Sequence, residues 1–354
     1  MYFHHVLLGL IVSAGLALPS AAAEITVRSA EMNGRSKGHY HDQIVEFQLT
    51  GEIRDGDDTA LRNLIATTMP AYYPNALSSV VIYLDSQGGS FSEGVKLMKS
   101  FKELGVGTVI AKDAACLSAC GIAFLGGTIV NDGSVFQRHR LVEPGARLGF
   151  HAPSLGVRGA TLVPADLLQV SYASALAALG QLIEASPDFD IPTSLLETIA
   201  KTSPEEMYEL IFVDDFARWK IDVKLAHQGW KPGRSHIARL CSNFFTWQSG
   251  ASALDRDMAV HLQWQQQLAN AVVFVPAASS GQPEFAHVQT LAYDYDEHCI
   301  VQMYPANWGW SIGLQITNAT PQTAIQALRT SNLGLPHASR LHTLPADLEV
   351  RSLR

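Results

Sequence analysis

The sequence predicts an α/β protein whose main sheet is parallel. Apolar strands such as residues 79–85, "SVVIYLD", lack polar alternation, which is typical of strands covered on both faces. Patterns with helical spacing alternate with these strands, as in residues 91–104. Strands that alternate with helices favour parallel pairing, because each helix carries the chain back to the same end of the sheet.

The elements of the N-terminal part follow one another in a regular order. Residues 41–69 predict a strand, a turn rich in Gly and Asp, and a helix capped near Asp57. The apolar strand at 79–85 ends in a glycine turn and is followed by the helix at 91–104. The sequence then predicts a short buried strand at 105–111, a helix of small residues at 114–125, and a strand at 147–153.

Beyond Pro153 the sequence predicts mainly helices, and a composition shift at residues 227–236 indicates a domain boundary. The helical segments begin at prolines or at a serine cap, at 164–185, 192–201, 203–211 and 213–221. We expect one domain over 24–230 and a smaller C-terminal domain over 237–354. Strand-like pieces at 274–276, 299–305 and 309–317 give the second domain a mixed or mainly β character, and no catalytic motif is evident there.

The N-terminus and the charge balance bear on location and partners. Residues 1–23 have an apolar run too short to span a bilayer and end in a small-residue cleavage pattern, which predicts a signal peptide and a periplasmic or secreted protein. This segment has no Lys or Arg, so a membrane anchor or a buried helix is the alternative. The net charge of −8 favours neither nucleic acid nor an anionic membrane surface as a partner.

Export would place the four cysteines in an oxidising compartment. Cys116 and Cys120 fall on the predicted helix at 114–125, where their spacing suits a disulfide poorly, so we expect two small core residues. Cys241 and Cys299 lie in the C-terminal part and predict a disulfide, with two buried thiols as the alternative.

Three segments together indicate acyl-transfer chemistry. Gly88 and Gly89 follow a strand and precede a helix, so their backbone N–H groups can turn outward as oxyanion donors. Ser118 stands at the start of a helix, where the N–H of Ala119 would join the same oxyanion hole. His151 ends a strand, and histidine is the usual base for a serine nucleophile near neutral pH.

Each of these residues has a plain structural interpretation when taken alone. A serine among small residues usually packs, a pair of glycines usually makes a turn, and a histidine at a strand end is usually a hydrogen-bonded structural residue. Their joint occurrence, in this order and at strand ends, favours the catalytic interpretation.

The three segments resemble the Clp-protease proteolytic subunit (ClpP) and its periplasmic relatives over roughly residues 45 to 225. Residues 86–89, "SQGG", resemble the family's glycine turn, and "CLSAC" with Gly127 resembles its serine stretch. The family's histidine motif resembles "FHAP" at 150–153. The resemblance implies a ClpP/crotonase-type spiral of β-β-α units, with Ser118 as nucleophile, His151 as base, and Gly88, Gly89 and Ala119 around the oxyanion.

Departures from the family pattern concern the base and the third member of the triad. The extra residues 130–140 are expected to form a loop near the site, and His139 within them is a rival base. Lys112 is a weaker alternative that would give a Ser–Lys site. The family's aspartate aligns with Tyr208 or a neighbour, which leaves the third member unknown, with Glu206 and Asp214 as weak candidates.

The resemblance implies a serine peptidase, for which we expect no cofactor or metal. The predicted export would separate it from cytosolic ATP, so we expect an ATP-independent enzyme. Its substrate would be a peptide or an unfolded segment, an ATP-driven unfoldase partner is not expected, and a homo-oligomer is implied. One alternative is an inactive ClpP-like protein that binds peptides, which the missing acid favours. The other is a crotonase-type acyl-thioester enzyme, which shares the oxyanion hole but needs no Ser–His pair.

Overall fold

The computed structural model describes twelve stretches of the chain, and every structural statement below concerns these residues: 23–32, 43–72, 79–131, 135–153, 164–225, 230–248, 250–255, 258–289, 297–306, 309–331, 337–338 and 340–353. The predicted signal peptide lies outside them except for Ala23. No helix in these stretches is both long and apolar enough to cross a membrane.

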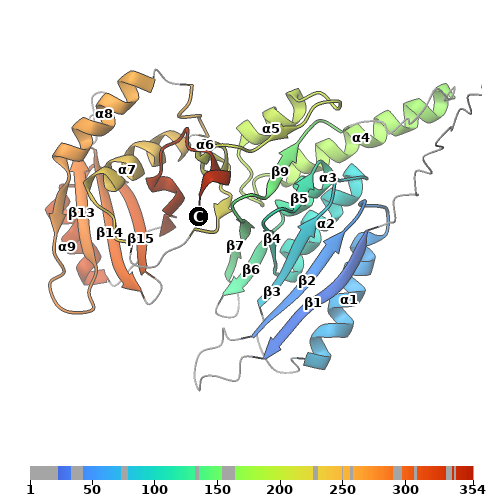
Figure 1. Ribbon diagram of the computed structural model, residues 1–354, viewed down its shortest axis with the longest axis horizontal. Coiled ribbons are helices and arrows are strands. Elements are labelled where there is room, and N and C mark those ends of the chain that lie inside the picture. Colours follow the sequence, from blue (N-terminus) through green and yellow to red (C-terminus); the bar gives the residue numbers. More distant parts are fainter. Residues whose placement is uncertain are drawn as a thin grey trace, which may run out of the picture.

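A six-stranded sheet, largely parallel as predicted, forms the centre of the N-terminal part (Figure 1). All neighbouring strands in it run parallel except β1, which pairs antiparallel with β2. The five residues of β4 are all buried, which agrees with a strand covered on both faces. In spatial order the strands are β1 (Glu24–Met32), β2 (Gln43–Thr50), β3 (Ser79–Asp85), β4 (Val106–Ile110), β8 (Arg140–Val142) and β11 (Asp222–Val223).

A second, smaller sheet lies beyond the carboxyl ends of these strands. Its three strands are β10 (Tyr208–Glu209), β9 (Arg147–Phe150) and β5 (Ala115–Leu117), with β5 and β9 parallel. Single parallel bridges extend it from Cys116 to Ser86 and from Gly89 to Ile53. Four successive units therefore each give a strand to the first sheet, then a strand or bridge to the second, and then a helix.

Helices of the N-terminal part follow these units. Helix α2 begins at the cap Ser90, whose hydroxyl accepts from the N–H of Glu93, and ends at the left-handed Gly105. The first part of helix α4 extends away from the rest of the molecule (Figure 1), whereas Leu182 and Ala185 near its end are buried in the core. The helices are α1 (Asp57–Tyr72), α2 (Phe91–Leu104), α3 (Ala119–Phe124), α4 (Ala165–Ala185), α5 (Thr193–Lys201) and α6 (Val213–Arg218).

The C-terminal part holds a five-stranded antiparallel sheet with helices packed on it. Its sheet order is β12 (Val273–Val275), β13 (Glu284–Gln289), β14 (His298–Ala306), β15 (Gly309–Thr317) and β16 (His337–Ala338). The helices are α7 (Arg234–Gln248), α8 (Met258–Ala271) and α9 (Pro321–Ser331). The disulfide predicted from the sequence joins Cys241 on α7 to Cys299 on β14.

The hydrophobic core is divided between the two parts, and the end of the chain crosses the division. One cluster surrounds the six-stranded sheet and another lies between α7, α8 and the C-terminal sheet. Residues 340–353, which include 3-10 helices at Arg340–Thr343 and Val350–Ser352, return to the first cluster. There the N–H groups of Val213 and Asp214 donate to the carbonyls of Leu348 and Ala346, so the last residues are part of the N-terminal fold.

The predicted helix at 114–125 is wrong in its first half. Residues Ala115–Leu117 form strand β5, and only Ala119–Phe124 form helix α3, with Ser118 at the turn between them. Because β5 completes the parallel pairing with β9, tertiary contacts override the helical pattern of small residues. The expectation of unpaired Cys116 and Cys120 fails for the same reason: the strand-to-helix turn brings their Cα atoms to 5.0 Å, and the two residues form a disulfide.

Candidate active site

The paired glycines form a tight turn at the end of β3. Gly88 and Gly89 have φ of 101° and 144°, a region that side chains disfavour. A Cβ atom on Gly88 would lie 2.6 Å from the Cβ of Ser118, and one on Gly89 would lie 2.1 Å from the carbonyl oxygen of Ile53. Glycine is therefore required at both positions, and the turn rests directly against Ser118.

Ser118 occupies a sharp turn between β5 and α3. Its backbone has φ of 56° and ψ of −123°, which is uncommon for any residue other than glycine. The N–H of Ser118 donates to the carbonyl of Gly149 on the neighbouring strand, at 3.0 Å, and the N–H of Leu117 donates to the carbonyl of Ser86 at 3.0 Å. These two bonds hold the turn between the glycine segment and β9, and Ser118 itself is half-buried. A nucleophile at a strained strand-to-helix turn is a recurring arrangement in hydrolases.

Two of the three predicted oxyanion donors are available and one is not. The N–H of Gly88 donates to the hydroxyl of Ser86 at 3.1 Å, so it is already bonded. The bridge to Ile53 uses the carbonyl of Gly88 and the N–H of Ser90, which directs the intervening N–H of Gly89 away from Ile53. Within the described part of the chain, the N–H groups of Gly89 and Ala119 donate no hydrogen bond.

His151 follows β9 directly, as Ser118 follows the adjacent parallel strand β5. The register pairs Leu117 with Gly149, so Ser118 and His151 leave the same edge of the small sheet. Within the described hydrogen bonds, none joins the Ser118 hydroxyl to the imidazole. The structure thus places the predicted nucleophile and base at neighbouring strand ends without a direct bond between them.

The imidazole of His151 is oriented by the main chain. Its Nδ1 lies 2.6 Å from the carbonyl oxygen of Ala152. A carbonyl oxygen only accepts, so Nδ1 carries the proton and Nε2 retains a lone pair in the neutral ring. This is the tautomer that a general base requires. The Ala152 segment is itself fixed, because its N–H donates to the carbonyl of Thr202 at 3.0 Å.

The weak acid candidates have other positions. Asp214 is fully buried and accepts from Trp247 Nε1, Ser252 Oγ and the N–H of Ala253, each at 2.7 Å. Asp214 thereby connects α6 to the last turn of α7 and to the residues that follow that helix. Glu206 is exposed.

The acids that neighbour these candidates lie differently. The carboxylate of Asp215 accepts from Tyr208 at 2.9 Å and from Arg218 at 2.8 Å. Burial, together with this carboxylate, raises the pKa of Tyr208 to about 12. The Ser203 hydroxyl and, more weakly, His151 lower the pKa of the Glu205 carboxyl. Glu205 and His151 therefore interact electrostatically.

The rival base His139 lies elsewhere, and the expected loop at 130–140 is wrong in form and position. Its described residues belong to an antiparallel pair, β6 (Thr128–Asn131) and β7 (Val135–Arg138), with His139 between β7 and β8. The N–H of His139 donates to the carbonyl of Gly127 after the end of α3, whereas Ser118 precedes its start. Burial lowers the pKa of His139. Lys112 is exposed.

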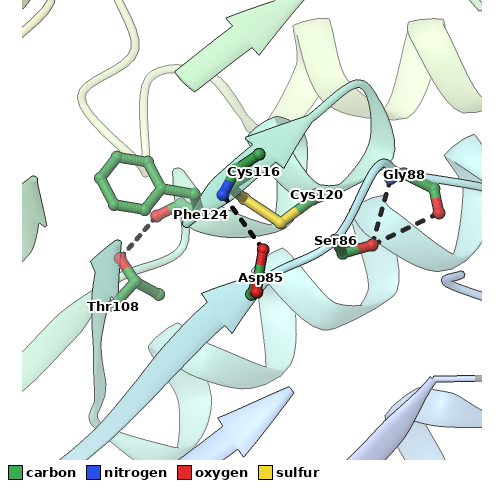
Figure 2. The surroundings of a disulfide bond; sticks show 8 residues. Asp85, Ser86, Gly88, Thr108, Cys116, Cys120 and Phe124 are labelled. Atoms are coloured by element: carbon green, nitrogen blue, oxygen red, sulfur yellow. Dashed lines mark hydrogen bonds between the residues drawn. A yellow bond between two sulfur atoms is a disulfide. The ribbon is translucent and has the colours of Figure 1, made fainter. Parts of the chain in front are cut away.

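Sequence reasoning missed the bond that closes around Ser118. Figure 2 shows the Cys116–Cys120 disulfide beside the end of β3, where Asp85, Ser86 and Gly88 lie. The Asp85 carboxylate accepts from the N–H of Ala115 at 3.1 Å, which attaches β5 to this end of β3. The signal that could have found the bond is the symmetric spacing of "CLSAC", with one cysteine on each side of the turn.

The chain matches no model of a known protein family, and no curated protein matches it. Within the described residues, no group of three or more His, Cys, Asp or Glu side chains is arranged to hold a metal ion. The geometry around Ser118 is therefore the observation from which a function can be argued.

Proposed function

We propose that the chain is a serine hydrolase that cleaves peptide bonds through an acyl-enzyme on Ser118. The observation that carries the proposal is the position of Ser118 at a strained turn, next to the N–H groups of Ala119 and of the neighbouring glycine turn at Gly89, which donate no hydrogen bond within the described part of the chain, and with His151 at the adjacent strand end. Strained backbone at a small, half-buried serine is typical of functional sites.

The reaction follows from these groups. Nε2 of His151 takes the proton of the Ser118 hydroxyl while Oγ bonds to the scissile carbonyl carbon. The carbonyl oxygen takes the electron pair and accepts from the N–H groups of Gly89 and Ala119. As the C–N bond breaks, the amine leaves with the proton from His151. Water then repeats the sequence on the ester and releases the acid.

The orienting role of a third carboxylate is assigned in this proposal to the carbonyl of Ala152. It fixes the tautomer of His151 but carries no full charge, so it stabilises the imidazolium less than an aspartate would. We therefore expect a slow hydrolase, in which Glu205 supplies negative charge that acts on His151.

The ClpP/crotonase spiral remains our proposal for the finer fold. Its support is the repetition of four units, each with one strand in the large sheet, one strand or bridge in the small sheet, and one helix. In such an arrangement the turns at Gly88, Ser118 and His151 come from successive units. The two disulfides support an exported protein, in which an ATP-driven partner is not expected.

The proposed homo-oligomer has support in helix α4. This helix exposes Val170, Tyr172 and Ile183 to 66%, 58% and 51%, and it has only two charged residues, Asp166 and Glu184. An apolar helix that projects into solvent is characteristic of a protein–protein contact. A second copy of the chain is the proposed occupant.

The alternative functions differ in what they use of this site. A peptide-binding protein without activity would keep the free N–H groups and would account for the lack of a Ser118–His151 bond among the described residues. A crotonase-type acyl-thioester enzyme would use the oxyanion donors but neither Ser118 nor His151.

A fluorophosphonate probe distinguishes these functions. We expect the folded wild-type chain to be labelled covalently, labelling to vanish in Ser118→Ala, and hydrolysis of short peptides to be lost in His151→Ala but retained in His139→Ala. A folded wild-type chain that the probe does not label would refute the hydrolase.

A further inference from the structure

The reactive turn lies inside a small covalent ring. Cys116 is on β5 and Cys120 is on α3, and their sulfur atoms are bonded to each other. Ser118 lies midway between the two cysteines along the chain. Both cysteines are fully buried. Figure 2 shows the bond running between the strand and the helix that the turn at Ser118 connects.

The strand side and the helix side of the turn are held by different means. Hydrogen bonds from Leu117 and Ser118 to Ser86 and Gly149 fix the strand side. On the helix side, the N–H of Ala119 donates no hydrogen bond to any described residue. On the helix side the disulfide is the covalent connection, and it keeps the first turn of α3 next to the strand.

This connection determines where the two reacting groups of the turn point. Ser118 has a left-handed φ of 56°, which an L-residue adopts rarely unless its surroundings impose it. If the ends of the turn were free to separate, rotation at Ser118 would move its Oγ and the N–H of Ala119 together. A ring closed across residues 116 and 120 restricts that rotation.

We infer that the Cys116–Cys120 disulfide is a positioning element of the Ser118 site, and that the chain acquires its reactivity only once this bond has formed. The inference rests on the proposed hydrolase. Bond formation removes two protons and two electrons from the two thiols, and a disulfide reagent such as glutathione disulfide accepts them and is reduced to two thiols.

Burial makes this a permanent element of the folded chain. A thiolate must reach a sulfur atom to break the bond, and neither sulfur is accessible in the native fold. We therefore expect millimolar dithiothreitol to leave the reactivity of the native chain unchanged, and refolding in the presence of dithiothreitol to prevent it.

The experiment compares the two disulfides in the full chain. Wild type, C116A/C120A, C241A/C299A and S118A are titrated with a fluorophosphonate, the labelling rate is separated into probe affinity and the first-order step, and Tm is measured by circular dichroism. We expect C116A/C120A to fold and to bind the probe with unchanged affinity, but its first-order rate constant of labelling should fall at least tenfold. C241A/C299A should keep the wild-type rate constant despite a larger fall in Tm.

The outcomes separate the inference from the function on which it rests. A wild-type chain without labelling overturns the proposed hydrolase and the inference with it. If the wild type is labelled and the first-order rate constant of labelling in C116A/C120A is within twofold of the wild-type value, the inference alone is overturned.

If C116A/C120A does not fold, C241A/C299A is refolded with dithiothreitol or with glutathione disulfide. Because this variant keeps only the Cys116–Cys120 pair, the two preparations isolate that bond. Equal labelling of both preparations would also overturn the inference, and slower labelling of the reduced one supports it.

Discussion

The two disulfides of the chain close loops of very different length. Four positions separate Cys116 and Cys120 in the N-terminal part, whereas 58 separate Cys241 and Cys299 in the C-terminal part. The chain-entropy estimate assigns about 2 kcal/mol to the shorter loop and about 4 kcal/mol to the longer one. The longer bond joins a helix to a sheet inside a hydrophobic cluster, and the shorter bond encloses one strained residue.

The difference teaches that a disulfide can act on the whole fold or on one local conformation. In the C-terminal part the bond limits the unfolded chain, and its effect is on stability. In the N-terminal part, by our inference, much of its effect falls on the turn at Ser118. Reactivity and stability should therefore respond to different residues, and the following variants test that separation.

The largest expected effect is at Ser118. Ser118→Ala should abolish fluorophosphonate labelling and lower peptide hydrolysis by more than about a thousandfold, because no other group in the site can form the acyl bond. Ser279→Ala, an exposed serine of the C-terminal part, is the matched control and should label as wild type. Labelling that persists in Ser118→Ala, located by mass spectrometry, would place the nucleophile elsewhere.

Loss of the longer disulfide should have the largest effect on stability. C241A/C299A should lower the free energy of unfolding by about 4 kcal/mol, and C116A/C120A by about 2 kcal/mol, as measured by urea denaturation. The reverse order would show that loop length does not govern the two contributions.

Removal of Asp214 should uncouple the two parts of the chain. Asp214→Ala leaves three buried donors without their acceptor and removes one of the two carboxylates that pair with Arg218, which should cost about 3 kcal/mol of unfolding free energy. Asp166→Ala, on the exposed start of α4, should change the unfolding free energy by less than about 0.5 kcal/mol. Near-native stability of Asp214→Ala would contradict this structural role.

Substitution of Gly89, the proposed oxyanion donor, should lower reactivity as well as stability. Gly89→Ala directs a Cβ at the Ile53 carbonyl and displaces the N–H, so we expect labelling to slow by about a hundredfold. Gly56→Ala is the matched control, since Gly56 also has a positive φ but its Cβ would meet open space. Equal labelling rates in the two variants would exclude Gly89 from the site.

Local patterns were sufficient for much of the fold. The apolar runs predict β3 and β4, and the helical spacing predicts α2 and α5. Burial on two faces and amphipathic periodicity can both be recognised from consecutive residues alone. The same reasoning placed the glycine turn and His151 at strand ends, where the structure has them.

The segment from Ala115 to Phe124 shows where local patterns stop. Small residues favour a helix throughout it, and only the pairing of β5 with β9 makes the first three residues a strand. The assumption of a single helix then hid the Cys116–Cys120 bond. The orientation of His151 by a main-chain carbonyl leaves no mark in the sequence either, since any residue at position 152 supplies that group.

The sequence by itself determined the α/β class, the parallel pairing in the main sheet, and the candidacy of Ser118 and His151. Those properties depend on residue type and on spacing along the chain. Only the tertiary structure decided which N–H groups remain free, which side of His151 carries the proton, and which cysteines are bonded. These depend on contacts between segments distant in sequence or on the exact path of a turn, which the order of residues does not specify.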